Sequence, residues 1–334
     1  MVVILKPKTS EKEIERLIEE LEKLNISVDK SQGSECTILG LVGDTSNIDP
    51  WVIESNECVQ RVMKVQEPFK KANRMFHPGN TVININGNEI GGNKIAIIAG
   101  PCSVEDEDQI TLVAKEVKKY GAGFLRGGAF KPRTSPYSFQ GLELEGLKLM
   151  QIAKQETGLQ IVSELMSPSY IDEFVDTVDI IQIGARNMQN YDLLKQVGKT
   201  NKPIILKRGL SSTIEEWLLS AEHIMAQGNE NIILCERGIR TYETYTRNTL
   251  DLSAIPVVKS YSHLPIIVDP SHATGHSRYV ESMAMASIAA GCDGLMIEVH
   301  NNPKEALSDG QQSVTPKEFD SIMKKVNILS NLQY

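Results

Sequence analysis

The sequence of 334 residues is short of long apolar runs, of aromatic residues and of positive charge. No run approaches the ~20 apolar residues that cross a bilayer, so we expect no membrane span. Aromatic residues make up 5% of the chain and its formal net charge is −8. Nucleic acids are bound by basic surfaces interleaved with aromatics, so these values argue against such a partner. The start, Met1–Lys8, is too short and too uncharged for a secretory signal, and we expect a cytoplasmic protein.

Cysteine is also scarce. The five cysteines fall at positions 36, 58, 102, 235 and 292, with no Cys-x-x-Cys pair. An odd number without paired spacing argues against a disulfide framework and favours a reducing compartment. Cys36 and Cys58 lie in apolar, strand-like runs and are interpreted as buried thiols.

Residues 1–67 alternate between strand-like and helical patterns in the order β-α-β-β-α-β. A helix after Ser10 carries apolar residues at helical spacing, and a shorter one is expected near Ile48–Ser55. The element order is that of a ferredoxin-like domain. The expected strands are Val2–Lys6, Ile26–Asp29, Cys36–Val42 and Val59–Val65.

A polar segment rich in turn residues, 68–80, is predicted to be a linker. It precedes the second predicted domain, residues 81–334. This domain opens with Thr81–Glu89, which alternates around Asn86-Gly87 and predicts a type I′ hairpin that closes the bottom of a barrel.

From Lys94 onward, eight strand-like runs alternate with helical stretches, of which Ile214–Gln227 and Tyr279–Ala290 are the clearest. This pattern predicts an α/β fold, a (β/α)₈ TIM barrel. An open doubly wound sheet is the alternative, but Ala99–Ser103 after the first run lacks the glycine fingerprint of that fold. The runs are Ile95–Ala99, Gly123–Leu125, Gln160–Ser163, Asp179–Ile183, Pro203–Leu206, Asn231–Leu234, Pro265–Val268 and Gly294–Ile297.

Cations follow the ends of several predicted strands, where the chemistry of such barrels is placed. The segment Leu125–Gly141 is the most informative, because glycines and prolines stiffen a loop that carries three cations. Ion pairs with Glu164, Glu236 and Asp269 are the alternative explanation. The cations outnumber these carboxylates, so we expect a polyanionic ligand. The set is Arg126, Lys131, Arg186, Lys207 and Arg237.

A second group contains metal-ligating side chains. Cys102, His272 and Glu298 follow three predicted strands, and Asp309 lies in the loop after the last one. Thiolate, imidazole and carboxylate ligands suit one first-row divalent ion, such as Mn, Fe, Co or Zn. Glu236 and His300 are the nearest competitors as ligands.

Together these motifs resemble one known family. The chain is similar to 3-deoxy-D-arabino-heptulosonate 7-phosphate (DAHP) synthases, in particular to the type I-beta branch, which has an N-terminal ferredoxin-like regulatory domain. Lys131–Ser135 is the most specific match, because octulosonate 8-phosphate synthases typically have Lys-Ala-Asn-Arg-Ser there. The matching stretches are Ala99–Glu105, Leu125–Gly141, Gln182–Asn187, Leu206–Gly209, Cys235–Gly238, Val268–His272 and Ile297–His300.

The resemblance implies the metal-dependent condensation of phosphoenolpyruvate with erythrose 4-phosphate, which releases phosphate and opens the shikimate pathway to the aromatic amino acids. It places the divalent metal on Cys102, His272, Glu298 and Asp309. It assigns Lys131, Cys102 and His272 to catalysis, with Lys131 as candidate proton donor.

The same resemblance distributes the substrate contacts. Arg186 and Arg237, helped by the Ala185 amide, would hold the phosphate of phosphoenolpyruvate. Its carboxylate would meet a second group of cations, and the sugar phosphate and a sugar hydroxyl would meet a third group of side chains. The carboxylate group is Arg126, Lys131 and Lys207, and the sugar group is Arg133, Thr134, Ser135 and Asp269.

For the N-terminal domain the resemblance implies feedback inhibition by tyrosine or phenylalanine, and for the whole chain a homotetramer. A domain that only mediates assembly is the alternative for residues 1–67. Two alternatives concern the activity: a 3-deoxy-D-manno-octulosonate 8-phosphate synthase, or an inactive barrel that serves as a sensor. Loss of a metal ligand or pocket cation would mark an inactive barrel, and none is missing.

Overall fold

A computed structural model describes residues 1–24, 26–32, 37–43, 45, 48–63, 67–131 and 135–330. The chain forms two compact units. The smaller comprises Met1–Asn80 and Ser260–His263, and the larger comprises Thr81–Lys259 and Leu264–Tyr334. In the described part of the chain, every helix is too short or too polar to cross a membrane.

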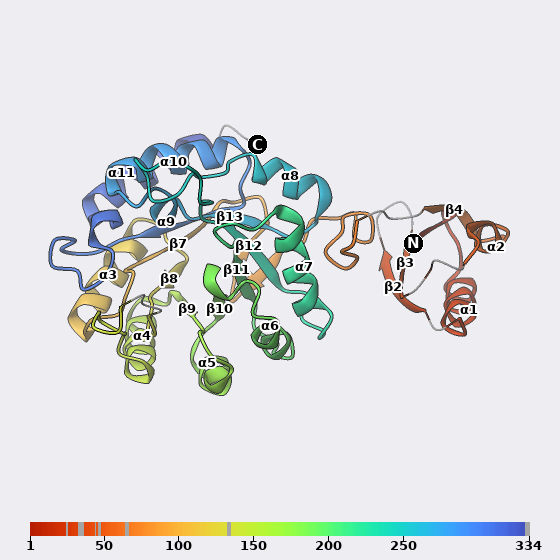
Figure 1. Ribbon diagram of the computed structural model, residues 1–334, viewed down its shortest axis with the longest axis horizontal. Coiled ribbons are helices and arrows are strands. Elements are labelled where there is room, and N and C mark those ends of the chain that lie inside the picture. The colour runs from red at the N-terminus through yellow and green to blue at the C-terminus, as the bar shows by residue number, and fades with distance from the viewer. Residues whose placement is uncertain are drawn as a thin grey trace. The chain divides into compact units, whose positions relative to one another are not determined.

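The smaller unit is a four-stranded antiparallel sheet with two helices (Figure 1). Helix α1 buries Ile14, Leu17 and Leu21, whose spacing places them on one face against the sheet. The sheet order is β2-β3-β1-β4, which confirms the predicted ferredoxin-like arrangement. The elements are β1 (Val2–Leu5), α1 (Glu11–Glu22), β2 (Ser27–Gln32), β3 (Thr37–Val42), α2 (Pro50–Glu54) and β4 (Val59–Met63).

The segment predicted as a linker packs with this smaller unit. Phe76 is buried with Val2 and Ile38. Its ring fills the space next to Gly40, where an added Cβ would lie 2.0 Å from a ring carbon. Glycine is therefore needed at position 40 for the segment to reach the sheet.

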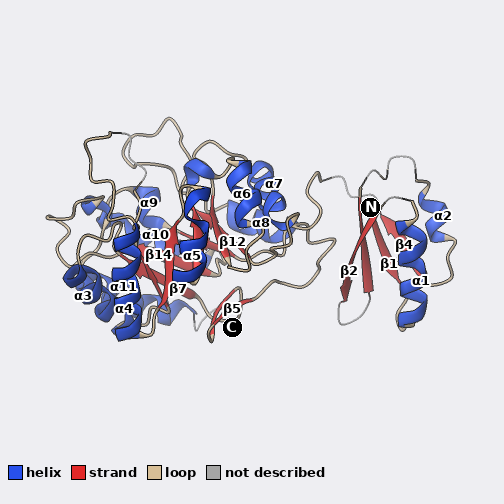
Figure 2. Cartoon of the chain, turned by 90° about the horizontal axis from the view of Figure 1, so that it is seen from below, coloured by secondary structure: helices blue, strands red, loops and turns tan. Residues whose placement is uncertain are grey.

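The larger unit is a closed barrel of eight parallel strands enclosed by helices (Figures 1 and 2). Each predicted run overlaps one of its strands, with ends shifted by at most two residues. This confirms the TIM barrel and excludes the open sheet. The strands are β7 (Ala96–Gly100), β8 (Phe124–Arg126), β9 (Gln160–Glu164), β10 (Ile180–Ile183), β11 (Ile204–Lys207), β12 (Ile232–Glu236), β13 (Ile266–Val268) and β14 (Gly294–Glu298).

The hairpin of β5 (Ile83–Ile85) and β6 (Asn88–Ile90) closes the bottom of the barrel. Its turn residues Asn86 and Gly87 have φ values of 51° and 89°, as a type I′ turn requires. Its three isoleucines join the core cluster of the barrel interior. The opposite end, where the strands finish, is left to polar side chains.

Helices cover the outside of the barrel, and short helices lie in the loops. The long ones carry apolar residues on the face that meets the strands; Trp217 of α7, for example, is fully buried. The α-helices are α3 (Glu107–Lys119), α4 (Leu144–Thr157), α5 (Ile171–Thr177), α6 (Tyr191–Val197), α7 (Ile214–Met225), α8 (Ala254–Tyr261), α9 (Pro270–Thr274), α10 (Ser277–Ala289) and α11 (Pro316–Ser330). The 3₁₀ turns are η1 (Pro168–Tyr170), η2 (Ala185–Asn187) and η3 (Gly310–Gln312).

The cysteines follow the prediction where the structure describes them. Cys58, Cys102, Cys235 and Cys292 are free and buried, whereas Cys36 lies outside the described residues.

Candidate active site and metal centre

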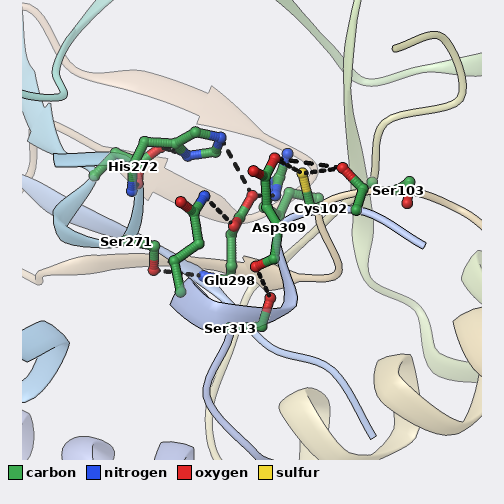
Figure 3. Close-up of polar contacts among 12 residues, drawn as sticks. Cys102, Ser103, Ser271, His272, Glu298, Asp309 and Ser313 are labelled. Atoms are coloured by element: carbon green, nitrogen blue, oxygen red, sulfur yellow. Dashed lines mark hydrogen bonds and ion pairs between the residues drawn. The ribbon is translucent and has the colours of Figure 1, made fainter. Parts of the chain in front are cut away.

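Three metal-ligating side chains converge at the ends of the barrel strands. Cys102 follows β7, His272 lies in α9 just after β13, and Glu298 ends β14. Their ligand atoms all lie within 4.8 Å of one another (Figure 3). A thiol, an imidazole and a carboxylate at this separation form a candidate metal site, as the sequence predicted.

The Cys102 thiol lies between an anion and a cation. It donates a hydrogen bond to Oδ2 of Asp309 at 3.0 Å, and Nζ of Lys131 donates to its Sγ at 3.0 Å. Burial, together with Glu298, raises the pKa of the thiol to about 12 despite the nearby lysine. Cys102 is therefore a neutral thiol in the metal-free protein.

Asp309 contacts this group without joining the cluster of three. It adopts a left-handed backbone conformation with φ of 52°, which is uncommon outside glycine. Burial opposes its ionisation, but the Cys102 hydrogen bond and the charges of His272 and Arg247 hold the pKa of its carboxyl below the usual value. Asp309 is thus an anion beside the thiol.

Asp269 fixes the orientation of the His272 ring. Its Oδ2 lies 2.7 Å from Nδ1 of His272, and its Oδ1 accepts from the His272 backbone N–H at 2.9 Å. Nε2 is thereby directed toward Oε1 of Glu298, 3.3 Å away. Burial lowers the pKa of His272 although both carboxylates oppose this. A carboxylate on Nδ1 that leaves neutral Nε2 free is the usual support of a metal-bound histidine.

Glu298 is fully buried and is held at both oxygens. Nη1 of Arg126 donates to Oε1 at 2.5 Å, and Nε2 of Gln312 donates to Oε2 at 2.6 Å. Burial opposes its ionisation, but His272 and Arg126 outweigh this effect, so the pKa of Glu298 lies below the usual value. The mixed thiol, imidazole and carboxylate set therefore fits a first-row divalent ion.

A cavity of about 210 Å³ opens beside the candidate metal site and shares His272 with it, and Asp309, the neighbour of Cys102, also lines this cavity. Its wall is rich in positive charge, and Glu164 and Asp309 are its two carboxylates. Four of the five predicted cations line it, together with two that the prediction missed, Arg240 and Arg247. Among the described residues, the cations of the wall are Lys131, Arg186, Lys207, Arg237, Arg240 and Arg247.

Two buried guanidinium groups have donors without partners among the described residues: Nη1 of Arg237 and Nε of Arg126. Arg237 faces the cavity, and burial lowers its pKa. Buried donors without partners are rare in native proteins. Arg237 is therefore a candidate to pair with an anionic guest in the cavity.

The ion-pair alternative holds for Lys207, which meets Asp269, whereas Arg126 pairs with Glu298, a partner that the alternative did not include. Arg126 does not line the cavity but pairs with Glu298 behind it. Lys207 lines the cavity and also donates to Oδ2 of Asp269 at 2.5 Å. Burial opposes the ionisation of Asp269, but His272 and Lys207 hold its pKa well below the usual value.

Of the remaining predicted residues, the structure describes Ser135, Ala185 and Asp269. Arg133 and Thr134 lie outside the described residues. Ser135 is exposed, and its hydroxyl accepts from the backbone N–H of Tyr137 at 3.3 Å. Ala185 lines the cavity, whereas Asp269 is buried behind it.

The two competing metal ligands have other partners. Oε2 of Glu236 pairs with Arg208 at 3.0 Å, and its Oε1 accepts from the Gly238 backbone N–H at 2.7 Å. Nε2 of His300 lies 3.3 Å from Glu105. Neither belongs to the cluster of three.

Comparison with known proteins finds similar sequences over nearly the whole chain. A model described as the DAHP synthetase I family matches residues 80–332, and one described as the DAHP synthase ferredoxin-like domain matches residues 1–67. Phospho-2-dehydro-3-deoxyheptonate aldolase of Thermotoga maritima is 45% identical over 331 residues, covering 99% of this chain and 98% of that protein.

A solved structure and a more distant relative are also similar to this chain. The crystal structure of the Thermotoga maritima enzyme, also described as DAHP synthase, has a TM-score of 0.80 at 44% identity and covers 99% of this chain and 97% of its own. A 2-dehydro-3-deoxyphosphooctonate aldolase of Geobacter sulfurreducens is 30% identical over 268 residues, covering 74% of this chain and 97% of that protein.

The protonation of Cys102 predicts how metal affinity depends on pH. The thiol pKa of about 12 means that a metal must displace one proton there. His272 has a lowered pKa and Glu298 is ionised, so neither adds a proton above neutral pH. Between pH 7 and 8 the Mn²⁺ association constant should rise roughly tenfold, measured by equilibrium dialysis.

The Cys102→Ala variant should bind Mn²⁺ more weakly, and its association constant should no longer rise with pH. Cys292→Ala is the matched control, because Cys292 is also buried, with a pKa raised to about 12, and is not part of the cluster. A pH-independent affinity in the unaltered protein would contradict the assignment.

Proposed function

We propose how the site works from one premise: the chain belongs to the DAHP synthetase I family. It is a DAHP synthase, the enzyme of the first step of the shikimate pathway, which joins phosphoenolpyruvate and erythrose 4-phosphate. The observation that carries the site assignment is Arg237, which lines a cation-rich cavity beside the candidate metal site and has a buried Nη1 without a partner among the described residues.

The metal assignment comprises Cys102, His272 and Glu298, with Asp309 as fourth ligand. Asp309 is included because it is an anion whose Oδ2 lies 3.0 Å from the Cys102 sulfur. One divalent ion, Mn, Fe, Co or Zn, suits this set. When bound, such an ion supplies Lewis-acid polarisation of the aldehyde oxygen of the sugar.

Phosphoenolpyruvate occupies the cation-lined cavity in this proposal. Arg186 and Arg237 hold its phosphate, and the Ala185 amide, at the start of a 3₁₀ turn on the cavity wall, assists. Lys131 and Lys207 neutralise its carboxylate, and Arg126, which pairs with Glu298 outside the cavity wall, is assigned to the same carboxylate by family membership alone. Cations fixed in a buried wall orient a trianionic ligand better than mobile ones in water.

Lys131 contacts Cys102 of the candidate metal site and also lines the cavity. Its Nζ donates to the backbone oxygen of Cys102 at 2.9 Å and to its sulfur at 3.0 Å, and its side chain lines the cavity. C3 of phosphoenolpyruvate attacks the aldehyde carbon, and the aldehyde oxygen takes a proton from Lys131. Water adds to C2 and returns one proton to Lys131. The C2 hydroxyl then gives its proton to the departing phosphate as the C2–O bond to phosphate breaks and the C2 carbonyl forms.

The sugar contacts are assigned by family membership. Arg133, Thr134 and Ser135 receive the phosphate of erythrose 4-phosphate. Asp269 is assigned to a sugar hydroxyl, and only its Oδ1 has acceptor capacity left, because Oδ2 already meets Lys207 and His272.

For regulation, we propose that the domain of residues 1–67, followed by a linker at 68–80, binds tyrosine or phenylalanine and inhibits the barrel. A family model for the ferredoxin-like domain of DAHP synthases matches these residues. Feedback requires two arrangements of the protein that differ in affinity for the effector. A homotetramer in the cytoplasm belongs to the same proposal, and a domain that only assists assembly is the competing view.

The octulosonate reaction is the second candidate activity, because relatives with that name cover most of the barrel. Two observations favour the heptulosonate reaction. The Thermotoga relative matches almost the full chain at 45% identity. The Lys131–Ser135 loop also carries Pro132-Arg133 rather than the asparagine-bearing sequence of octulosonate enzymes.

The choice between the two sugars is tested by phosphate release from phosphoenolpyruvate. With Mn²⁺ present, erythrose 4-phosphate should support turnover and arabinose 5-phosphate should not. EDTA should abolish turnover and added Mn²⁺ should restore it. Preference for arabinose 5-phosphate would contradict the inference, drawn from the Lys131–Ser135 loop, that the enzyme catalyses the heptulosonate reaction.

The role of Arg237 is tested by Arg237→Met. Methionine keeps an unbranched apolar stem but removes the guanidinium charge from a buried site, a loss worth about 2–5 kcal/mol. We expect kcat/KM for phosphoenolpyruvate to fall roughly 100-fold or more, while Mn²⁺ affinity stays unchanged.

Arg278→Met is the control for this variant. Arg278 is exposed on α10 and stacks 4.6 Å from the ring of Tyr279. Its replacement should leave kcat/KM within twofold. A similar loss in both variants would remove Arg237 from the phosphate site.

A further inference from the structure

Gln312 connects Glu298 of the candidate metal site to the loop that carries Arg247. Neither Gln312 nor Arg247 was identified in the sequence analysis. Gln312 is fully buried at the end of η3. Its Nε2 donates to Oε2 of Glu298 at 2.6 Å, and its Oε1 accepts from Nη1 of Arg247 at 3.0 Å. Because the arginine can only donate, the amide can satisfy both neighbours in one orientation only.

Arg247 reaches the second carboxylate with the same nitrogen. Its Nη1 lies 3.4 Å from Oδ1 of Asp309. Arg247 therefore bridges Asp309 and Gln312, and through Gln312 it reaches Glu298. Both carboxylates of the proposed metal site are linked through one arginine and one amide.

The loop that carries Arg247 is tied to the helix that carries His272. The backbone N–H of Arg247 donates to Thr274 at 2.9 Å, and that of Asn248 donates to Ala273 at 2.8 Å. The side chain of Asn248 donates to the carbonyl of His272 at 3.1 Å. The histidine thus shares its backbone support with the arginine.

Asp309 and Gln312 belong to one tight turn. The Gln312 backbone N–H donates to the Asp309 carbonyl at 3.2 Å. An added Cβ at Gly310 would lie 2.0 Å from the carbonyl oxygen of Pro303, so the turn has no room to widen there. A change at Gln312 is consequently transmitted to Asp309 through the backbone as well as through Arg247.

We propose that Gln312 and Arg247 are positioning residues that hold Glu298 and Asp309 in the geometry a divalent metal requires. This inference rests on the proposed metal-dependent function. By holding Oε2, Gln312 fixes the carboxylate plane and leaves Oε1 turned toward His272 and Arg126. A neutral amide performs this task without adding charge beside two anions.

The proposal separates metal binding from substrate binding. Gln312 does not line the cavity, so it should act on the metal and not on phosphoenolpyruvate. Partners that orient metal ligands typically contribute 10–100-fold to metal affinity. Weaker metal binding with an unchanged KM for phosphoenolpyruvate at saturating metal is the expected signature.

The test is Mn²⁺ binding to the full-length metal-free protein, measured by equilibrium dialysis. Gln312→Met keeps the side-chain length and removes both hydrogen bonds. Its Kd for Mn²⁺ should rise about 10–100-fold, with KM for phosphoenolpyruvate within twofold of the unaltered protein.

Gln160→Met is the matched control. Gln160 is also a buried glutamine; its Oε1 accepts from Asn86 at 2.7 Å and its Nε2 donates to Gly158 at 3.2 Å. It lies at the start of β9, the opposite end of the barrel, and should leave the Mn²⁺ affinity unchanged. An equal loss in both glutamine variants, or none in Gln312→Met, would overturn the proposal.

Arg247→Met and Arg247→Lys keep the proposal testable if Gln312→Met fails to fold. Arg247 has 39% of its side chain exposed, so its replacement should be tolerated. The methionine variant should bind Mn²⁺ about tenfold more weakly, and lysine should restore part of the affinity. Unchanged affinity in Arg247→Met would overturn the proposal. If the unaltered protein lacks metal-dependent turnover, the proposed function itself fails; normal turnover with unaffected variants refutes only the positioning role.

Discussion

Closure of eight parallel strands into one barrel is the constraint on which the site depends. Closure brings the carboxyl ends of all strands to one rim, so residues distant in the sequence become neighbours. Cys102 and Asp309, 207 positions apart, share a hydrogen bond of 3.0 Å. The hairpin of β5 and β6 fills the other end with isoleucines, which leaves the upper rim for polar groups.

The rim is stable only because its buried charges are matched. Glu298 with Arg126, and Asp269 with Lys207 and His272, are pairs in which removal of one member would leave an uncompensated charge. Such pairs also hold side chains in fixed positions, as at His272, whose Nδ1 is bonded to Asp269. The cations that remain for a ligand are those on the cavity wall, above all Arg237.

Strand ends were predictable to within two residues because the apolar runs of the sequence mark the buried part of each strand. Cys102, His272 and Glu298 directly follow or end a strand, and they cluster as predicted. Arg240, Arg247 and Gln312 lie in loops or turns whose course depends on tertiary contacts, such as the bonds from residues 247 and 248 to α9. Residue type alone could not separate Glu236 and His300 from the cluster, because their partners Arg208 and Glu105 are set by the packing of the loops.

Cys102 is proposed to ligate a metal together with nitrogen and oxygen donors. X-ray absorption at the zinc edge, on protein loaded with one Zn²⁺ per chain, tests it directly. We expect one sulfur at about 2.3 Å and nitrogen or oxygen neighbours at about 2.0–2.2 Å, with the sulfur lost in Cys102→Ser. A spectrum of nitrogen and oxygen neighbours alone in the unaltered protein would contradict the account.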